Sequence, residues 1–266
     1  MFKIADKEIL SKTVKKIVVE AEYIAKKALP GQFVVIRIDE KGERIPLTIA
    51  SADRNKGLIT LIFQEVGFTT AKLGRLNSGD SVLDILGPLG HAAEIIKYGT
   101  VVCVAGGVGI AEVLPVAEAL RKAGNEVIGI IGARSKDLII LEREMREVCD
   151  ELFITTDDGS YGQKGLVTDV LREILNRPTD LVYAIGPVPM MEAVANLTRG
   201  YKIKTIVSLN PIMVDGTGMC GSCRVSVDGK IKFCCVDGPD FDGHLVDFKE
   251  LAQRLKLFKS QEGAIK

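Results

Sequence analysis

Four residues with metal-binding side chains lie near the carboxyl end in the spacing Asp-x4-Cys-x2-Cys-x11-Cys: Asp215, Cys220, Cys223 and Cys235. The plant-type spacing for a two-iron cluster is Cys-x4-Cys-x2-Cys followed by a distant fourth cysteine. The chain therefore matches this spacing with aspartate in the first place. Glycines between these residues let a backbone wrap closely around a cluster and direct its amides at sulfur atoms. The spacing predicts a [2Fe-2S] cluster with three thiolate ligands and one carboxylate ligand.

Zinc is the other metal that these thiols could hold. Cys-x2-Cys also occurs in zinc knuckles, so Cys220, Cys223, Cys234 and Cys235 form a second candidate set. Adjacent residues of a strand point to opposite faces, so Cys234 and Cys235 would rarely reach one metal ion together. We therefore favour the iron-sulfur interpretation, with Cys234 as a packed neighbour. A purely structural role for the thiols is the third alternative.

A glycine turn, Ala-Gly-Gly-Val-Gly-Ile at residues 105–110, follows an apolar run and precedes a helical pattern. In this context backbone amides can approach a pyrophosphate at a helix N-terminus. Glu112 stands where the dinucleotide fingerprint has its third glycine, so the motif alone leaves an ordinary structural turn open. Turns at later strand ends strengthen the prediction, because ligands bind outside the carboxyl ends of parallel strands. The residues at these turns are Gly106, Gly107, Val108, Gly109, Ile110, Gly132, Ala133, Arg134, Asp157, Asp158, Gly186, Pro187 and Met190.

A second candidate anion site lies nearer the amino terminus. The run Arg-Ile-Pro-Leu-Thr-Ile-Ala-Ser at residues 44–51 places a fixed cation next to a strand that bears a hydroxyl. Arginine suits bidentate phosphate binding, and alternate strand residues could line a flat ring. Downstream, Gly67, Thr69 and Thr70 lie at the expected start of a helix, where a cap can also receive an anion. An ordinary surface arginine and an ordinary helix cap are the alternatives for each segment taken alone.

The elements that must position these residues fall into three regions. Residues 1–97 contain short β-type runs separated by turns, with a single helix at 69–76, which predicts an antiparallel sandwich or barrel. Residues 98–210 alternate strand and helix, which predicts an α/β doubly wound parallel sheet. Residues 211–266 contain the glycine- and cysteine-rich loop, a hairpin across Asp228-Gly229, and a terminal helix with a frayed tail from residue 248.

Composition excludes several classes of function. The 266 residues include 35 Lys plus Arg and 35 Asp plus Glu, so the basic excess usual for nucleic-acid binding is absent. The longest uncharged stretch, residues 98–111, is well short of the roughly 20 residues that cross a bilayer, and the amino terminus lacks the apolar block of a secretion signal. We expect a soluble, cytoplasmic protein that binds neither nucleic acid nor membrane. Clustered cysteines in that compartment indicate metal binding, whereas Cys103 and Cys149 are expected to be buried.

In combination, these motifs resemble the ferredoxin-NADP reductase superfamily, whose members couple a flavin-binding barrel to a nicotinamide-binding domain. The carboxyl-terminal cysteine module resembles that of the dihydroorotate dehydrogenase B electron-transfer subunits. Those subunits normally have cysteine where this chain has Asp215, and proline where it has Glu112. With one aspartate and three cysteines around the cluster, the chain is more similar to the small subunits of NADH-dependent reduced ferredoxin:NADP oxidoreductase, also described as sulfide dehydrogenase subunits. The resemblance covers nearly the whole chain.

The resemblance implies an FAD-binding barrel at 1–97, an NAD(P)-binding domain at 98–210 and a [2Fe-2S] module with a tail at 211–266. In the superfamily an Arg-x-Tyr-(Ser/Thr) strand holds FAD, and here Pro46 stands where many relatives have the aromatic residue. The implied FAD contacts are Arg44 to the pyrophosphate, Pro46, Leu47, Thr48 and Ile49 to the isoalloxazine and ribityl chain, and Gly67, Thr69 and Thr70 to the phosphates. The glycine turn and the later strand ends would receive NAD(H), which is preferred on family grounds to NADP(H), although Arg134 could pair with a 2′-phosphate.

The implied function is that of an electron-transfer flavoprotein subunit of an electron-bifurcating enzyme. It would pass electrons between NAD(H), FAD and the [2Fe-2S] cluster to a larger flavin and iron-sulfur partner subunit in a heterodimer, and would serve ferredoxin indirectly. No general acid or base is required, so no catalytic side chain is expected, and His91 and His244 are expected in loops. The alternatives are the electron-transfer subunit of dihydroorotate dehydrogenase B or of a sulfide dehydrogenase, a stand-alone flavin reductase, and a non-enzymatic, zinc-stabilised nucleotide-binding module.

Overall fold

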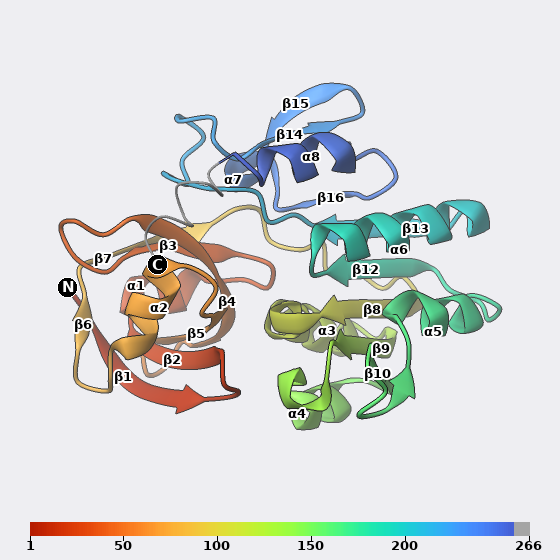
Figure 1. Ribbon diagram of the computed structural model, residues 1–266, viewed down its shortest axis with the longest axis horizontal. Coiled ribbons are helices and arrows are strands. Elements are labelled where there is room, and N and C mark those ends of the chain that lie inside the picture. Colours follow the sequence, from red (N-terminus) through yellow and green to blue (C-terminus); the bar gives the residue numbers. More distant parts are fainter. Residues whose placement is uncertain (258–266) are drawn as a thin grey trace.

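The computed structural model describes residues 1–257, which form two large units side by side and a small third unit (Figure 1). The first unit is a barrel and the second an α/β unit, and the chain then returns across both of them. The tail predicted beyond the last helix falls at residues 258–266, outside the described residues. Among residues 1–257, no helix has the length and apolar character needed to span a bilayer.

Seven short strands form the antiparallel, nearly closed sheet of the barrel, in the order β6-β1-β2-β5-β4-β3-β7. Successive strand residues point to opposite faces, so one face of each strand, with Ile17, Leu61 and Phe63 among its residues, fills the barrel core. The predicted barrel is confirmed. The strands are β1 (Phe2–Ile9), β2 (Val14–Glu20), β3 (Phe33–Arg37), β4 (Arg44–Asp53), β5 (Leu58–Gln64), β6 (Ser81–Val82) and β7 (Asp84–Leu89).

The barrel differs from the sequence prediction in two places. A second helix, α1 (Glu22–Lys27), accompanies the expected helix α2 (Phe68–Arg75), so the prediction of a single helix was wrong. At six residues and without a side-chain cap, α1 is too short for a clear helical period, and burial of Ile24 and Ala25 in the core stabilises it. One of the β-type runs of this region, residues 81–86, is divided between the strands β6 and β7 at Leu83, whose amide donates to the Ile38 carbonyl, 3.0 Å away.

The second unit is a doubly wound sheet, as predicted, and its strand order is β11-β10-β9-β8-β12-β13-β16. All its pairings are parallel except that of the edge strand β16 with β13. Residues 101–105 of β8 are fully buried, which explains why this strand has no polar alternation. The strands are β8 (Thr100–Gly106), β9 (Glu126–Ala133), β10 (Glu151–Thr156), β11 (Gln163–Lys164), β12 (Leu181–Ile185), β13 (Lys204–Ser208) and β16 (Asp240–Asp242).

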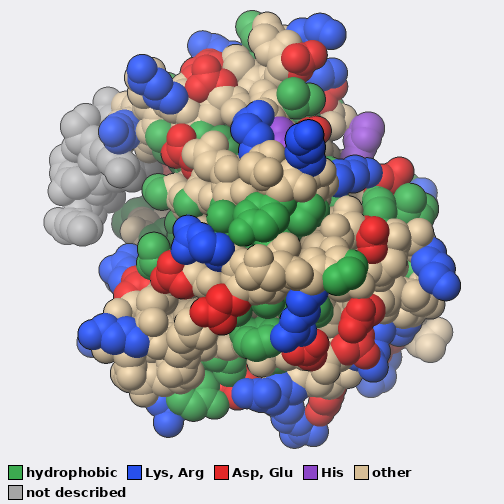
Figure 2. All heavy atoms as spheres, turned by 90° about the vertical axis from the view of Figure 1, so that its right-hand side faces the viewer, with side chains coloured by type: hydrophobic (Ala, Val, Ile, Leu, Met, Phe, Trp, Pro, Cys, Tyr) green, Lys and Arg blue, Asp and Glu red, His purple; other side chains and the backbone are tan. Residues whose placement is uncertain are grey.

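Helices cover both faces of this sheet. One core contains α3 (Ile110–Lys122) and α4 (Glu142–Val148), and the opposite core contains α5 (Val167–Ile174) and α6 (Val188–Tyr201). The strand order reverses between β8 and β12, which is the position where open α/β sheets bind ligands. Figure 2 shows basic and acidic side chains interspersed over the face of the molecule on the right of Figure 1, in keeping with equal numbers of each in the sequence.

The third unit follows β13. A loop leads to the hairpin of β14 (Arg224–Val227) and β15 (Lys230–Phe233), then to the single turn α7 (Cys234–Asp237), β16 and α8 (Phe248–Arg254). Asp228 and Gly229 have φ angles of 52° and 69°, as a type I′ turn requires, so the predicted hairpin is confirmed. Because β16 joins the second sheet, this unit is fastened to the α/β unit by backbone hydrogen bonds.

Candidate cofactor sites

The four predicted cluster ligands lie in one neighbourhood as two pairs. The outer pair consists of Asp215 and the exposed Cys220, whose amide donates to Asp215 Oδ2 at 2.8 Å. The inner pair consists of Cys223 and Cys235, which are buried with their Sγ atoms 3.2 Å apart. Amide donors from Thr217 and Cys220 lower the pKa of the Asp215 carboxyl, so it is present as a carboxylate, the form that binds metal.

Glycines shape the loop that carries three of these ligands. Gly216, Gly218 and Gly221 have φ angles of 75°, 83° and 68°, in the left-handed region that L side chains rarely adopt. The Gly218 amide hydrogen-bonds to the Cys235 thiol, so the loop already directs one amide at a predicted ligand. This arrangement fits a cluster whose sulfur atoms accept backbone hydrogen bonds.

The spacing of the inner pair is close to what two thiolates on one metal atom require. Two thiolates bound about 2.3 Å from one tetrahedral metal lie roughly 3.8 Å apart, so the inner pair needs only a small opening to share one. In the described part of the chain no group of three or more His, Cys, Asp or Glu side chains is gathered closely enough to form a ready metal site. Burial and the adjacent Cys223 raise the pKa of Cys235 to about 12, a cost that a bound cation would offset.

Cys234 faces away from the inner pair. Its Sγ lies 3.4 Å from the Leu209 carbonyl and 4.0 Å from the Pro239 carbonyl, and burial raises its pKa well above the ordinary value. The expectation that Cys234 and Cys235 are strand neighbours was wrong, because both lie in the turn α7. Neighbouring helical residues also diverge, so the zinc set with both cysteines gains no support from this geometry.

The cluster loop touches the barrel. A Cβ added to Gly216 would lie 2.9 Å from Val35 Cγ2 and 2.8 Å from Leu89 Cδ1, so the loop packs directly on β3 and β7. Val35 is in turn the cross-strand partner of Pro46 on β4. Val35 also shares one apolar core with Cys223 and Cys235. Only one strand therefore separates the cluster loop from the segment expected to hold the flavin ring.

The predicted flavin residues lie along β4 and at the start of α2. Pro46, Leu47 and Thr48 are half-buried, and Ile49 is buried in the barrel core. Arg44 is exposed and has no ion-pair partner among residues 1–257. The Thr69 hydroxyl donates to Glu43 Oε2 at 2.8 Å, which brings the Arg44 end of β4 against the start of α2, as one phosphate site would require.

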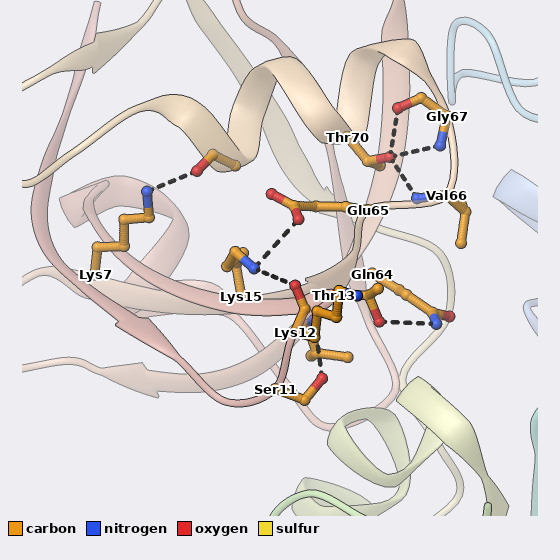
Figure 3. A network of polar contacts seen from close by, with 12 residues as sticks. Lys7, Ser11, Lys12, Thr13, Lys15, Gln64, Glu65, Val66, Gly67 and Thr70 are labelled. Carbon is orange, nitrogen blue, oxygen red and sulfur yellow. Dashed lines mark hydrogen bonds and ion pairs between the residues drawn. The ribbon is translucent and has the colours of Figure 1, made fainter. Parts of the chain in front are cut away.

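A polar network fixes the turn that precedes α2 (Figure 3). Thr70 Oγ1 accepts hydrogen bonds from the Val66 and Gly67 amides at 3.1 and 3.0 Å. One step earlier, Glu65 pairs with the buried Lys15 at 3.2 Å, and the Lys15 ammonium also donates to the Lys12 carbonyl at 3.0 Å. Sequence reasoning missed Lys15 and Glu65, because 49 other residues separate them in the chain and neither carries a motif.

The two predicted turns at the reversal of strand order meet. A Cβ on Gly106 would lie 2.6 Å from Met190 Sδ and 3.1 Å from Pro187 Cδ, and one on Gly186 would lie 3.1 Å from the Gly106 amide nitrogen. Gly107, with a φ of 58°, has open space where its Cβ would be. Ile110, Val108 and Gly109 continue the turn into α3, and Gly109 is pressed against the Ile185 carbonyl. These glycines permit close approach of two strand ends and leave open space beside Gly107.

The remaining nucleotide candidates lie at the ends of β9 and β10. The amides of Asp157 and Asp158 donate to the carbonyls of Ala133 and Arg134 at 3.1 and 3.2 Å, which brings the two segments together. Gly132 serves packing, since a Cβ there would lie 2.4 Å from Val167 Cγ1. An open cleft of about 570 Å³ adjoins them. The sequence prediction did not name most of its lining residues: Leu10, Ser135, Lys136, Asp137, Ile139 and Ser160, beside Asp158.

Sequence reasoning did not pair two carboxyl groups, Glu112 and Asp240, that lie where the units meet. Glu112, in the first turn of α3, hydrogen-bonds with Thr48 of β4, and burial raises its pKa to about 7. Asp240 of β16 accepts a hydrogen bond from the Tyr183 hydroxyl at 2.6 Å, and burial raises its pKa to about 6. The signal in the sequence was the acidic residue directly after the glycine turn. Its partner lies 128 residues away and could not be found from spacing.

Two family models match segments of the chain. Residues 103–196 match the oxidoreductase NAD-binding domain, a range that begins in β8 and includes the glycine turn and Met190. Residues 210–247 match the iron-sulfur cluster binding domain of dihydroorotate dehydrogenase B, a range that includes all four predicted ligands.

Individual relatives extend the similarity over nearly the whole chain. A Thermotoga maritima homologue of the dihydroorotate dehydrogenase B (NAD(+)) electron-transfer subunit is 50% identical over 90% of this chain and 85% of its own length. The electron-transfer subunit of this enzyme from Fusobacterium nucleatum is 33% identical over 86% of this chain and 91% of its own. A chain from the structure of NADH-dependent reduced ferredoxin-NADP oxidoreductase, solved in work on flavin-based electron bifurcation, superposes with a TM-score of 0.95. It is 46% identical and covers 99% of this chain and 96% of its own.

Proposed function

Because this chain belongs to the family of dihydroorotate dehydrogenase B electron-transfer subunits and their homologues, we propose that it carries electrons between a nicotinamide dinucleotide and a partner subunit. The proposed cofactors are FAD in the barrel (1–97), NAD(H) in the α/β unit (98–210) and a [2Fe-2S] cluster in the third unit (211–266). When bound, the nicotinamide and flavin exchange electrons in pairs and the cluster accepts them singly. The chain supplies binding, orientation and spacing.

The contact between the cluster loop and the barrel carries this proposal. Gly216 packs on Val35, and Val35 pairs with Pro46, so the expected flavin strand and the expected cluster ligands are held by one continuous core. A nucleotide-binding module without a redox relay has no need of that contact. The same core excludes water between the two sites, because its members Phe33, Val35, Cys223 and Cys235 are all buried.

Each group of residues has a proposed role. Asp215, Cys220, Cys223 and Cys235 hold the cluster. Arg44, Gly67, Thr69 and Thr70 receive the FAD phosphates at the junction of β4 and α2, and residues 46–49 line the flavin ring. The open amides at Gly107 and the ends of β9, β10 and β12 receive the dinucleotide, whose nicotinamide would point toward β4, because α3 packs against β4.

The experiment is anaerobic titration of the purified protein with NADH, followed by absorbance and electron paramagnetic resonance. The proposal expects bound FAD, about two iron atoms per chain, flavin bleaching by NADH and a reduced two-iron signal. A colourless protein that contains zinc would contradict it. NADPH, tested in parallel, decides the proposed preference for NAD(H), since Arg134 is the cation available for a 2′-phosphate.

The proposed function has two forms, which differ in the partner subunit that receives the electrons. The 46% identical structural relative and the carboxylate at residue 215 favour a bifurcating enzyme, in which a larger flavin and iron-sulfur subunit serves ferredoxin and NADP. The 33% identical relative favours a dihydroorotate dehydrogenase subunit as the partner instead. Purification of the complex under anaerobic conditions from the cell that makes this chain, followed by assays with ferredoxin and with dihydroorotate, distinguishes them. Turnover of dihydroorotate would overturn the first form.

A further inference from the structure

Glu112 lies where the α/β unit meets the strand expected to hold flavin. It is the third residue of α3, and this helix packs against β4 of the barrel. Ala50 of β4 shares a core with Ala111 and Val113, the two neighbours of Glu112, and Thr48 hydrogen-bonds with the Glu112 side chain. The carboxyl group therefore extends from the nucleotide domain to the surface of the barrel.

Asp240 approaches the same place from the third unit. Its strand, β16, pairs with β13 so that Asp240 is opposite Ser208, and Tyr183 donates to its Oδ2 at 2.6 Å. The other oxygen, Oδ1, is buried and has no hydrogen-bond partner among residues 1–257. A buried acceptor left without a donor is costly in a folded protein. Protonation of the carboxyl pair would reduce that cost.

The surroundings of the pair place proton binding by Glu112 close to neutral pH. Burial raises the pKa of Glu112 to about 7, and the negative charge of Asp240 contributes to that rise. The groups that face the pair are the Thr48, Tyr183 and Ser208 hydroxyls and the buried, neutral Cys234 thiol, so in the described part of the chain no cation opposes it. Because the charge of Asp240 acts on Glu112, the two carboxyls titrate as a coupled unit, and a further negative charge beside them would raise the pKa of Glu112 above neutral pH.

We propose that Glu112, coupled to Asp240, takes up one proton from solvent when flavin beside Thr48 is reduced, and releases it when the electrons leave. This inference rests on the proposed function. Two electrons and one proton pass from the reduced nicotinamide as it is oxidised, and the flavin then carries one net negative charge. The proton on the Glu112 carboxylate comes from water and balances that charge, so no further oxidant or reductant is needed. Glu112 forms no bond to either cofactor.

The test measures the flavin midpoint potential against pH in the intact, cofactor-loaded protein. In wild type the slope includes uptake by Glu112, so Glu112→Gln is expected to show about one fewer proton per two electrons near neutral pH. Glu118→Gln is the matched control, because Glu118 lies on the same helix, is exposed and pairs with Lys122 at 2.5 Å. It is expected to leave the slope unchanged. Equal slopes in wild type and Glu112→Gln would overturn the proposal.

A second measurement does not depend on that variant. The reduced-minus-oxidised infrared difference spectrum of the wild-type protein should gain a protonated-carboxyl band, and Asp240→Asn should shift its appearance to lower pH, since Asp240 no longer raises the pKa of Glu112. Absence of the band in wild type would overturn the proposal. Flavin and iron contents are measured first, so loss of cofactors refutes the proposed function, whereas normal cofactors without proton uptake refute this inference alone.

Discussion

The two loops expected to bind cofactors, residues 211–223 and 65–70, are built in different ways. The second loop is fixed by the protein's own charges: Lys15 pairs with Glu65, and Thr70 accepts hydrogen bonds from two amides of the turn (Figure 3). The first has no ion pair of this kind among the described residues; glycines in the left-handed region and a buried thiol pair define it. A preorganised loop should tolerate loss of its ligand, whereas the cluster loop should depend on its metal for stability.

The largest expected effect comes from removing an inner cluster ligand. Cys223→Ala should abolish iron binding and lower the free energy of unfolding by about 3–5 kcal/mol, because the buried partner Cys235 loses both the metal and its neighbour. Iron analysis and urea denaturation measure the two effects. Cys234→Ala is the matched control, since it removes an equally buried thiol that faces Leu209 and should keep its iron. Bound zinc that is lost in this control would instead support the zinc set.

Gly216→Ala is expected to rank next. The alanine would meet a φ of 75°, which costs about 1–2 kcal/mol, and its Cβ would collide with Val35 and Leu89. Overpacking adds about 1–3 kcal/mol and pushes the loop off the barrel, so electron transfer from flavin to cluster should slow in stopped-flow traces. Gly229→Ala, with a φ of 69° and open space at its Cβ, isolates the backbone strain. If both variants behaved alike, contact with the barrel would be unimportant.

The preorganised loop is broken by removing its buried cation. Lys15→Met leaves the largely buried Glu65 carboxylate without its partner, which should cost about 1–3 kcal/mol and weaken FAD binding through disorder of the turn before α2. Fluorescence titration of the apoprotein with FAD measures the loss. Lys16→Met is the control, because Lys16 pairs with the exposed Glu8 and should change stability by less than about 1 kcal/mol. Unchanged FAD affinity in Lys15→Met would show that the ion pair between Lys15 and Glu65 is not needed to order this loop for FAD binding.

The smallest effect on stability and the most specific effect on chemistry are expected for Asp215→Cys. Thiolate is a softer donor than carboxylate, so the variant should keep its iron, change its unfolding free energy by less than about 1 kcal/mol, and alter the resonance spectrum and potential of the cluster. Asp228→Asn, in the hairpin turn of the same unit, should change neither. Identical spectra for wild type and Asp215→Cys would exclude Asp215 as a ligand.

Local patterns predicted much of this architecture. The buried run of β8 indicated a parallel sheet, and Asp228-Gly229 indicated the hairpin. The spacing of Asp215, Cys220 and Cys223, which lie in one loop, indicated the cluster site. These features depend on neighbours in sequence, where backbone conformation and side-chain period are decided.

What the sequence could not predict depends on distant parts of the chain. Glu112 meets Asp240, and Lys15 meets Glu65, only because separate strands and helices pack together. Helix α1 was missed because tertiary burial, and not its own short sequence, stabilises it. Motif reasoning therefore singles out Glu112 beside the glycine turn but cannot find its distant partner Asp240.

The central claim is that Asp215, Cys220, Cys223 and Cys235 hold a two-iron cluster within electron-transfer distance of FAD. The most direct measurement is electron paramagnetic resonance of protein that has been reduced with NADH under anaerobic conditions and frozen, with iron and flavin determined on the same sample. We expect a two-iron signal, about two iron atoms and one flavin per chain. A sample with bound zinc, or with bleached flavin and no paramagnetic cluster, would contradict it.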